Sequence, residues 1–199
     1  MPEIEDGAGL GGHAAGVDSE NKLQTRAVTE TENDHNAREG HAYNWNSGAP
    51  FDIGANDSSA VAFLKNTDQT YNLIVTAFIY NLGSAAGAAT DGSEFTNVVV
   101  VRNPTSISSG TTVAPVNKNG GSTNLLNGTF QKGAAGATFT GGTDMLETLI
   151  ASTTGGRNFI NVGAVVVAPQ NSIGIRFDAH TSTTQQYVQF ATAMFLERS

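Results

Sequence analysis

The sequence predicts a mainly β protein: an antiparallel β-sandwich, jelly-roll-like, with an extended N-terminal arm and one short helix. Its 199 residues include 23 Gly, 23 Thr, 18 Asn and 14 Ser, which favour turns and short strands, whereas charged residues make up only 14%. Eight to ten apolar or alternating segments follow one another without a helix-length apolar stripe between them. Two one-sided sheets of this kind bury their apolar faces by packing against each other.

The length suits one domain, and the absence of cysteine excludes disulfides and Cys-containing zinc sites. No apolar run approaches the ~18 residues of a membrane span. The acidic start, Met1 to Asp6, lacks the apolar segment of a signal peptide. We therefore expect no membrane association and no secretory route.

Negative charge is concentrated at the start of the chain. Residues 1–40 hold nine acidic and three basic residues and so carry six of the eight net negative charges. We define residues 1–40 as the acidic arm and residues 41–199 as the sandwich domain. Neither part offers the cationic surface that phosphates need, so no binding of nucleic acid is expected.

A short helix is predicted over residues 29–39, at the end of the acidic arm. Thr29 followed by Glu32 fits a capping box, and acidic residues crowd the first turn, where the helix dipole favours them. Arg38 falls in the last turn, and Gly40 suits the C′ position that ends a helix.

The strands are predicted from alternation and β-branched runs. Residues 43–46 alternate Tyr43 and Trp45 with two asparagines, and the four valines of 98–101 favour a strand covered on both faces. The pairs Asn119-Gly120 and Asn127-Gly128 predict type I′ hairpin turns. Other strands are predicted around 61–63, over 71–80, 158–167, 173–178 and 187–197, and more weakly near 112–116, 123–130 and 145–150.

No common catalytic motif is present, because the chain has no cysteine nucleophile, no Gly-x-Ser-x-Gly elbow and no Walker loop. Glycoside hydrolysis needs two acids that face one cleft, and no convincing pair stands out. Beyond the acidic arm, Asp52, Asp57, Asp68 and Asp91 fit turns in which a carboxylate accepts hydrogen bonds from its own backbone. We therefore predict that the chain is not an enzyme.

The histidines are His13, His35, His41 and His180. His35 and Glu39 share a helix face, but His41 lies beyond the helix stop, so a solvated face explains them better than a metal site. His180 is expected in an exposed turn.

The sequence signals for a calcium site and for glycan attachment are equally weak. Asp91 and Glu94 lack the ligand spacing of a calcium loop. The sequons at Asn56 and Asn127 carry little weight without a signal peptide. No metal and no cofactor is predicted.

Two segments carry a family resemblance. Residues 17–32, Val-Asp-Ser-Glu-Asn-Lys-Leu-Gln-Thr-Arg-Ala-Val-Thr-Glu-Thr-Glu, and residues 40–48, Gly-His-Ala-Tyr-Asn-Trp-Asn-Ser-Gly, resemble the start of a group of tailed-bacteriophage virion structural proteins. In that group a comparable segment leads into a β-rich body, and residues 172–177 resemble its late strand. The resemblance covers about the first 50 residues well and the rest by general pattern. The chain departs from the group in its Gly/Ala-rich residues 7–16 and its small-residue insertions.

The resemblance implies a capsid decoration or cement protein that self-associates, as a homotrimer, and binds the major capsid protein on the outer surface of the virion. Assembly would take place in the host cytoplasm. Several weak contacts that are tied together would clamp neighbouring capsid subunits by avidity. The resembling motifs carry no catalytic residues. The interface residues on this reading are Val17, Leu23, Arg26, Val28, Tyr43 and Trp45.

Other readings stay open at this point. A head or tail fibre, a baseplate component or a receptor-binding domain would use the same sandwich to bind host glycans through exposed aromatic residues. Tyr43 and Trp45 are the candidates for such a platform, but their alternation favours inward positions. A glycan-processing enzyme would need an acid pair, and a secreted TNF-like or lectin-type module would need a signal peptide. A free sheet edge could also take the arm of a neighbour as an added strand.

Overall fold

The computed structural model describes residues 31–54, 58–84, 95–151, 157–160, 165–179 and 186–198. The compact unit that contains the sandwich begins at Asn33. The elements of the structure are α1 (Glu32–Arg38), β1 (Ala42–Asn46), β2 (Phe51–Gly54), β3 (Ser58–Asn66), β4 (Tyr71–Ser84), β5 (Phe95–Arg102), β6 (Ser106–Ile107), β7 (Thr111–Thr112), β8 (Val116–Asn117), β9 (Gly128–Lys132), β10 (Phe139–Thr140), β11 (Thr143–Ala151), β12 (Arg157–Ile160), β13 (Val165–Val167), β14 (Ser172–Ala179) and β15 (Gln186–Arg198).

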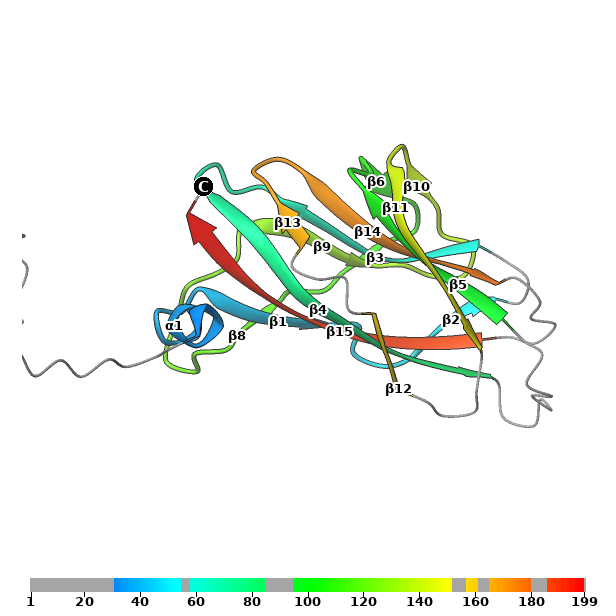
Figure 1. Cartoon of the computed structure of the whole chain (residues 1–199), viewed down its shortest axis with the longest axis horizontal. Coiled ribbons are helices and arrows are strands. Elements are labelled where there is room, and N and C mark those ends of the chain that lie inside the picture. The colour runs from blue at the N-terminus through cyan, green and yellow to red at the C-terminus, as the bar shows by residue number, and fades with distance from the viewer. Residues whose placement is uncertain are drawn as a thin grey trace, which may run out of the picture. The chain divides into compact units, whose positions relative to one another are not determined.

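Two antiparallel sheets pack face to face, as the two layers in Figure 1 show. Sheet 1 has the order β12-β4-β15-β1-β8, with β13 also paired to β4 and β2 also paired to β15. Sheet 2 has the order β11-β5-β14-β3-β9-β7. The predicted mainly β sandwich with one short helix is confirmed.

The path of the chain crosses repeatedly between the two sheets. The chain changes sheet between β2 and β3, between β3 and β4, between β4 and β5, between β11 and β12, between β13 and β14, and between β14 and β15. Strands β1 and β2 both belong to sheet 1, as do β12 and β13, and β5 and β11 both belong to sheet 2. As a result the first and last strands, β1 and β15, lie side by side in sheet 1, and β3 lies beside β14 in sheet 2. The main strands are therefore joined by sequence-distant pairing rather than by simple hairpins.

Strand β1 shows why this sequence forms a half-buried strand. Tyr43 and Trp45 point into the sandwich, whereas Asn44 and Asn46 point to solvent, as the alternation predicts. The Trp45 indole Nε1 donates a hydrogen bond of 2.7 Å to the carbonyl of Val113, and its ring centroid lies 4.8 Å from that of Phe190. An interior indole is thus packed and hydrogen-bonded at once.

The valine run of β5 is covered on both faces, as predicted. Val98 and Val100 belong to the core between the sheets. Val99 and Val101 point to the outer side of sheet 2, yet they are also buried. Residues 103–142, which join β5 to β11, supply the cover, and Val101 lies directly under Gly142.

The cover of sheet 2 has its own apolar cluster. Strands β6 and β10 form a small separate sheet that lies over β3 and β14. Phe139 packs on Gly174, where an added Cβ would come within 2.4 Å of the ring. The buried members of this cluster are Ala60, Phe63, Ile107 and Ala137.

Helix α1 ends as the sequence predicts. Gly40 has a φ of +75°, and the amides of Gly40 and His41 donate to the carbonyls of Ala37 and Asn36 at 3.2 and 2.7 Å. This pair of bonds is a Schellman motif with glycine at C′. Thr29, the expected N-cap, lies outside the described residues.

Two local predictions are wrong or incomplete. Neither Asn119-Gly120 nor Asn127-Gly128 has positive φ, so neither pair forms a type I′ turn. Asn119 instead donates from its side-chain amide to the carbonyl of Arg38 at 2.8 Å, and Gly128 begins β9, where a Cβ would approach the Lys65 carbonyl within 2.7 Å. The strand predicted over 158–167 is described as two pieces, β12 and β13, which pair with the same strand, β4.

Candidate interaction surface

Tyr43 and Trp45, the interface residues expected in the body, lie in the interior of the sandwich. Their exposed fractions are 1% and 0%. The Tyr43 hydroxyl donates to the Gly40 carbonyl at 3.3 Å, and burial raises the pKa of Tyr43. Their side chains cannot reach a partner, so the candidate interface does not include them. The other four expected interface residues, Val17, Leu23, Arg26 and Val28, lie outside the described residues.

Of the expected metal candidates, His35 and Glu39 are exposed on and just after α1, and the ring of His41 packs near that of Tyr71, with centroids 5.9 Å apart. Within the described part of the chain, no group of three or more His, Asp or Glu side chains is placed to hold a metal ion. Other candidates, namely His13, His180, Asn56, Asp57, Asp91 and Glu94, lie outside it.

Asp68 confirms the prediction of a turn carboxylate. Its Oδ1 accepts hydrogen bonds from the backbone amides of Thr70 at 2.7 Å and Tyr71 at 3.0 Å. Its Oδ2 accepts from the side-chain amide of Asn127 at 3.2 Å. These bonds, with that of Thr70 the largest, hold the pKa of Asp68 below its ordinary value. Asp52, by contrast, lies in strand β2.

An ion cluster that joins three charged side chains lies on the outer side of sheet 2. Arg176 donates to both oxygens of Asp144, at 3.1 and 3.0 Å, and also to Asp178 at 2.8 Å. Burial favours the neutral form of Asp178, but hydrogen bonds from Arg176 and Ser58 together outweigh it and lower the pKa of Asp178. Because one guanidinium binds both carboxylates, the cluster is a structural clamp rather than an acid–base pair.

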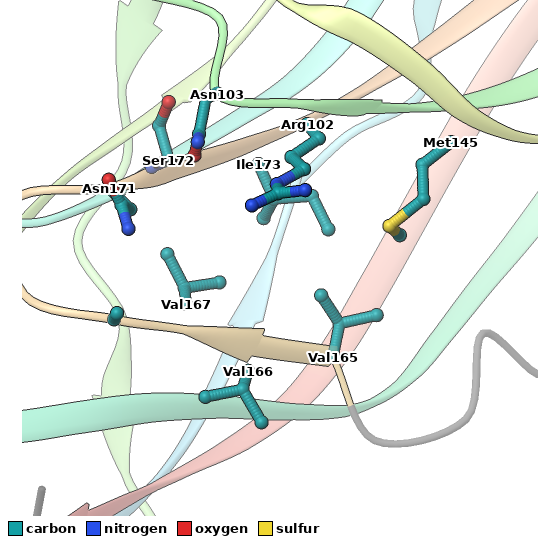
Figure 2. Close-up of a pocket in the computed structure, with 10 residues that line it drawn as sticks. Arg102, Asn103, Met145, Val165, Val166, Val167, Asn171, Ser172 and Ile173 are labelled. Carbon is teal, nitrogen blue, oxygen red and sulfur yellow. Dashed lines mark hydrogen bonds between the residues drawn. The ribbon is translucent and has the colours of Figure 1, made fainter.

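A groove opens between the two sheets where β13 faces β5, β11 and β14. Its volume is about 450 Å³. Figure 2 shows Val165 and Val167 pointing from β13 toward Arg102 and Ile173, whereas Val166 points away. Met145 of β11 lies at one side of the groove, and Asn103, Asn171 and Ser172 line the other. We call this the Arg102 groove.

The chemistry of the Arg102 groove is mixed. Valine and isoleucine side chains form its walls, and the guanidinium of Arg102 supplies one positive charge. Among the described residues, Arg102 has no hydrogen-bond or ion-pair partner through its side chain, in contrast to Arg176. The groove therefore suits an apolar group that lies next to a carboxylate.

Large apolar side chains are exposed on or beside the edge strands of the two sheets. Met145 and Leu146 on β11 and Val166 on β13 are exposed by 49%, 39% and 58%. On the other side, Val116 of β8 is exposed by 65% and Leu125, in the loop between β8 and β9, by 85%. These exposed apolar side chains are the candidate contact points for a partner.

Sequence reasoning missed this surface. Leu125 stands beside Leu126, whose side chain packs against the core, so the dipeptide reads as one more weak strand. Arg102 ends a run of valines and looks like an ordinary strand terminus. Its position in a groove depends on β13, which comes from a segment more than 60 residues later in the chain.

Comparisons of the chain with protein-family models, with curated proteins and with solved structures found no match. Among the described residues, no helix has the length and apolar character needed to cross a membrane.

Proposed function

We propose that this protein is a structural component of a tailed-phage virion, a capsid decoration or cement protein on the outer surface of the head. It associates with copies of itself, as a homotrimer, and binds the major capsid protein. Its work is mechanical, since it adds buried area at junctions between capsid subunits rather than turning over a substrate. The observation that carries the proposal is the exposure of large apolar side chains at both edges of a sandwich whose largest aromatic side chains, such as Trp45 and Phe190, are buried.

A protein that works by packing against other proteins needs both a stable core of its own and exposed apolar side chains for its partners. Large aromatic side chains fill the chain's own core and make the body rigid. They are Trp45, Phe78, Tyr80, Phe177 and Phe190. The edges, by contrast, hold apolar groups that only another protein surface can cover. The resemblance of residues 17–32 and 40–48 to virion structural proteins favours a capsid as that surface.

The electrostatics of the body favour the same role over catalysis. Asp144 and Asp178 are both bound to Arg176, so neither is poised to exchange a proton with a substrate. The acidic arm holds most of the net charge, so it would supply charge complementary to a cationic partner surface.

A glycan-binding fibre or baseplate domain is the second candidate, but its aromatic platform would have to come from other residues than Tyr43 and Trp45, because both are buried. The two candidates differ in what the acidic arm does. In a decoration protein the arm contributes to attachment, whereas in a receptor-binding domain it is not needed for binding the host.

Deletion of residues 1–28 tests the proposal. The deletion variant should fold, because the described sandwich begins later in the chain, but it should occupy purified particles much less than the full chain. A chain in which residues 1–28 are scrambled keeps the same length and charge and serves as the matched control; it should also bind weakly. Raising the salt concentration should loosen attachment of the full chain only modestly, because screening acts on charges and not on apolar contacts. Full occupancy by the deletion variant would contradict the proposal.

A further inference from the structure

The end of helix α1 is bound by side-chain amides from β8 and from the loop that follows it. Asn119 donates from its Nδ2 to the carbonyl of Arg38 at 2.8 Å, and Asn117 donates from its Nδ2 to the carbonyl of Gly40 at 2.8 Å. The last carbonyls of a helix have no partner within the helix itself. The two asparagine amides therefore cap α1 and join its end to the sandwich.

One of these asparagines is followed by glycine. In an Asn-Gly pair the backbone nitrogen of glycine reaches the side-chain carbonyl carbon of asparagine easily, because glycine has no Cβ to hinder it and a wide range of backbone angles. Such pairs are therefore prone to lose the asparagine amide group. The chain contains two of them, Asn119-Gly120 and Asn127-Gly128.

The pair Asn119-Gly120 lies in an open turn. Gly120 is exposed, and no heavy atom lies within 4 Å of the position that a Cβ would take there. Its backbone amide donates to no acceptor among the described residues, so the nitrogen is accessible. The Oδ1 of Asn119 accepts a hydrogen bond of 3.0 Å from the Gly121 amide. This oxygen takes up negative charge when a nucleophile adds to Cγ, and the hydrogen bond stabilises that charge.

The pair Asn127-Gly128 is packed instead. Gly128 begins β9, where a Cβ would come within 2.7 Å of the Lys65 carbonyl. The backbone carbonyl of Asn127 accepts a hydrogen bond from the Thr67 amide at 3.3 Å, and its Nδ2 donates to Asp68 at 3.2 Å. Attack by the Gly128 nitrogen would require this segment to leave its strand pairing first.

We propose that Asn119 is a deamidation site, and that its conversion to aspartate or isoaspartate releases the end of α1 from the sandwich. The Gly120 nitrogen gives its proton to a base in the solvent and forms a bond to Cγ of Asn119. The Cγ–Nδ2 bond then breaks, and the nitrogen leaves as ammonia after taking a proton from the solvent. Water opens the resulting cyclic imide at either carbonyl, so the reaction consumes one water and releases one ammonia.

The product cannot make the hydrogen bond to α1. A carboxylate has no donor for the Arg38 carbonyl, so two acceptors face each other. Its negative charge also lies beside the C-terminal end of a helix, where the aligned peptide dipoles are negative. The Asn117 bond and the packing of Ala37 remain, so α1 frays while the sandwich stays folded. The change falls where the acidic arm joins the sandwich domain, and it does not depend on the proposed function.

Ageing of the purified full chain tests the site. The protein is incubated in mildly alkaline buffer made with heavy-oxygen water, so that each hydrolysed imide takes up a labelled oxygen, and its peptides are analysed by mass spectrometry. Label should appear at residue 119 about tenfold faster or more than at residue 127, because Asn127 reacts only after local opening of its strand pairing. Both aspartate and isoaspartate should be found at residue 119.

Gly120→Ala is the matched variant, since it leaves Asn119 in place. The position has open space for a Cβ and no positive φ, so alanine fits without strain. The added methyl group should hinder the attacking nitrogen and abolish most of the label at residue 119, while label at residue 127 stays the same. Label at residue 127 before residue 119, or at neither residue, would overturn the deamidation site.

Hydrogen exchange of Asn119→Asp tests the consequence for α1. The amides of Gly40 and His41, which close the end of the helix, should exchange about three- to tenfold faster, because a hydrogen bond of the cap is lost. The midpoint of global unfolding should stay nearly the same. Asn127→Asp adds the same charge away from α1 and should leave both amides unchanged.

Two further results would count against the release of α1. Unchanged exchange at Gly40 and His41 in Asn119→Asp would mean that the Asn119 amide does not hold the helix. Equal acceleration by Asn127→Asp would mean that added charge alone, rather than the lost hydrogen bond, loosens it. All these measurements use purified protein, so their outcome is separate from that of particle binding by the deletion variant.

Discussion

The outer faces of the two sheets differ in what lies over them. Over sheet 2, residues 103–142 lay down a second layer in which Phe139 covers Gly174 and Ile107 covers Phe63. Over sheet 1, α1 covers one end through Ala37, which packs on Ile74 and Phe195. The middle of that face, on the described strands β1 and β15, presents Asn44, Asn46, Gln189 and Ala191, which are uncharged and small or amide-bearing.

This difference shows that strands of similar composition can have either a covered or an open outer face. An outer face can be apolar, like that of sheet 2, if the chain supplies its own cover. Where the described residues supply no cover, alternation with Asn, Gln and Ala keeps the strand in register and leaves an uncharged face. The insertion of residues 103–142, rather than the strands themselves, therefore decides which side of the sandwich is closed. The same insertion also carries Val116 and Leu125 to the edge.

The largest expected effect on stability comes from the core that both sheets share, and Trp45 is the residue to change there. Trp45→Ala removes a fully buried indole with its hydrogen bond to Val113 and should cost about 3–5 kcal/mol of unfolding free energy. Denaturant unfolding measures it. The preceding residue on the same strand, Asn44, points outward, and Asn44→Ala should change stability by less than about 0.5 kcal/mol. A loss below about 1 kcal/mol for Trp45→Ala would contradict the packing described.

A matched pair of small substitutions separates the two faces. Gly174→Ala places a methyl group against the Phe139 ring and should destabilise the fold by about 1–3 kcal/mol, because the cover must shift. Ala191→Val adds two methyl groups on the open face, where its side chain is exposed, and should change stability by no more than about 0.5 kcal/mol. Equal losses from the two variants, measured by thermal or denaturant unfolding, would mean that the open face is in fact covered.

Acid should weaken the covered side through Asp178. The pKa of Asp178 in the folded protein lies below its ordinary value, which is near 3.9 in an unfolded chain. The stabilising contribution of its carboxylate is therefore complete above that ordinary pKa, and it is lost as the pH falls through the lower pKa of the folded protein. Asp178→Asn should cost about 1–2 kcal/mol at pH 7, and the gap between variant and parent should close in strong acid. Unfolding curves at a series of pH values measure this gap. A gap that does not change with pH would show that the carboxylate charge is not what stabilises the cluster.

The sequence was informative wherever a signal was local. Alternation placed Tyr43 and Trp45 inside, the valine run gave a doubly covered strand, and Gly40 ended the helix at the expected position. The sandwich followed from these signals, because one-sided strands without intervening helices have few other ways to bury their apolar faces.

Features that depend on sequence-distant contacts were not predictable in the same way. Asn127-Gly128 has the composition of a hairpin turn, but Gly128 is needed where the chain passes close to the Lys65 carbonyl, so the backbone stays extended. The Arg102 groove brings together β5, β11, β13 and β14, and no local pattern indicates that they converge. Edge exposure at Leu125 likewise depends on which strand happens to be the last in its sheet.

The number of copies per virion tests the central claim most directly. Quantitative mass spectrometry of purified particles, normalised to the major capsid protein, gives it. The account predicts near parity with the capsid subunit, since a decoration protein occupies equivalent positions over the whole shell. A few copies to a few dozen would contradict it and place the protein in the tail, baseplate or fibres, and absence from particles would rule out a virion role.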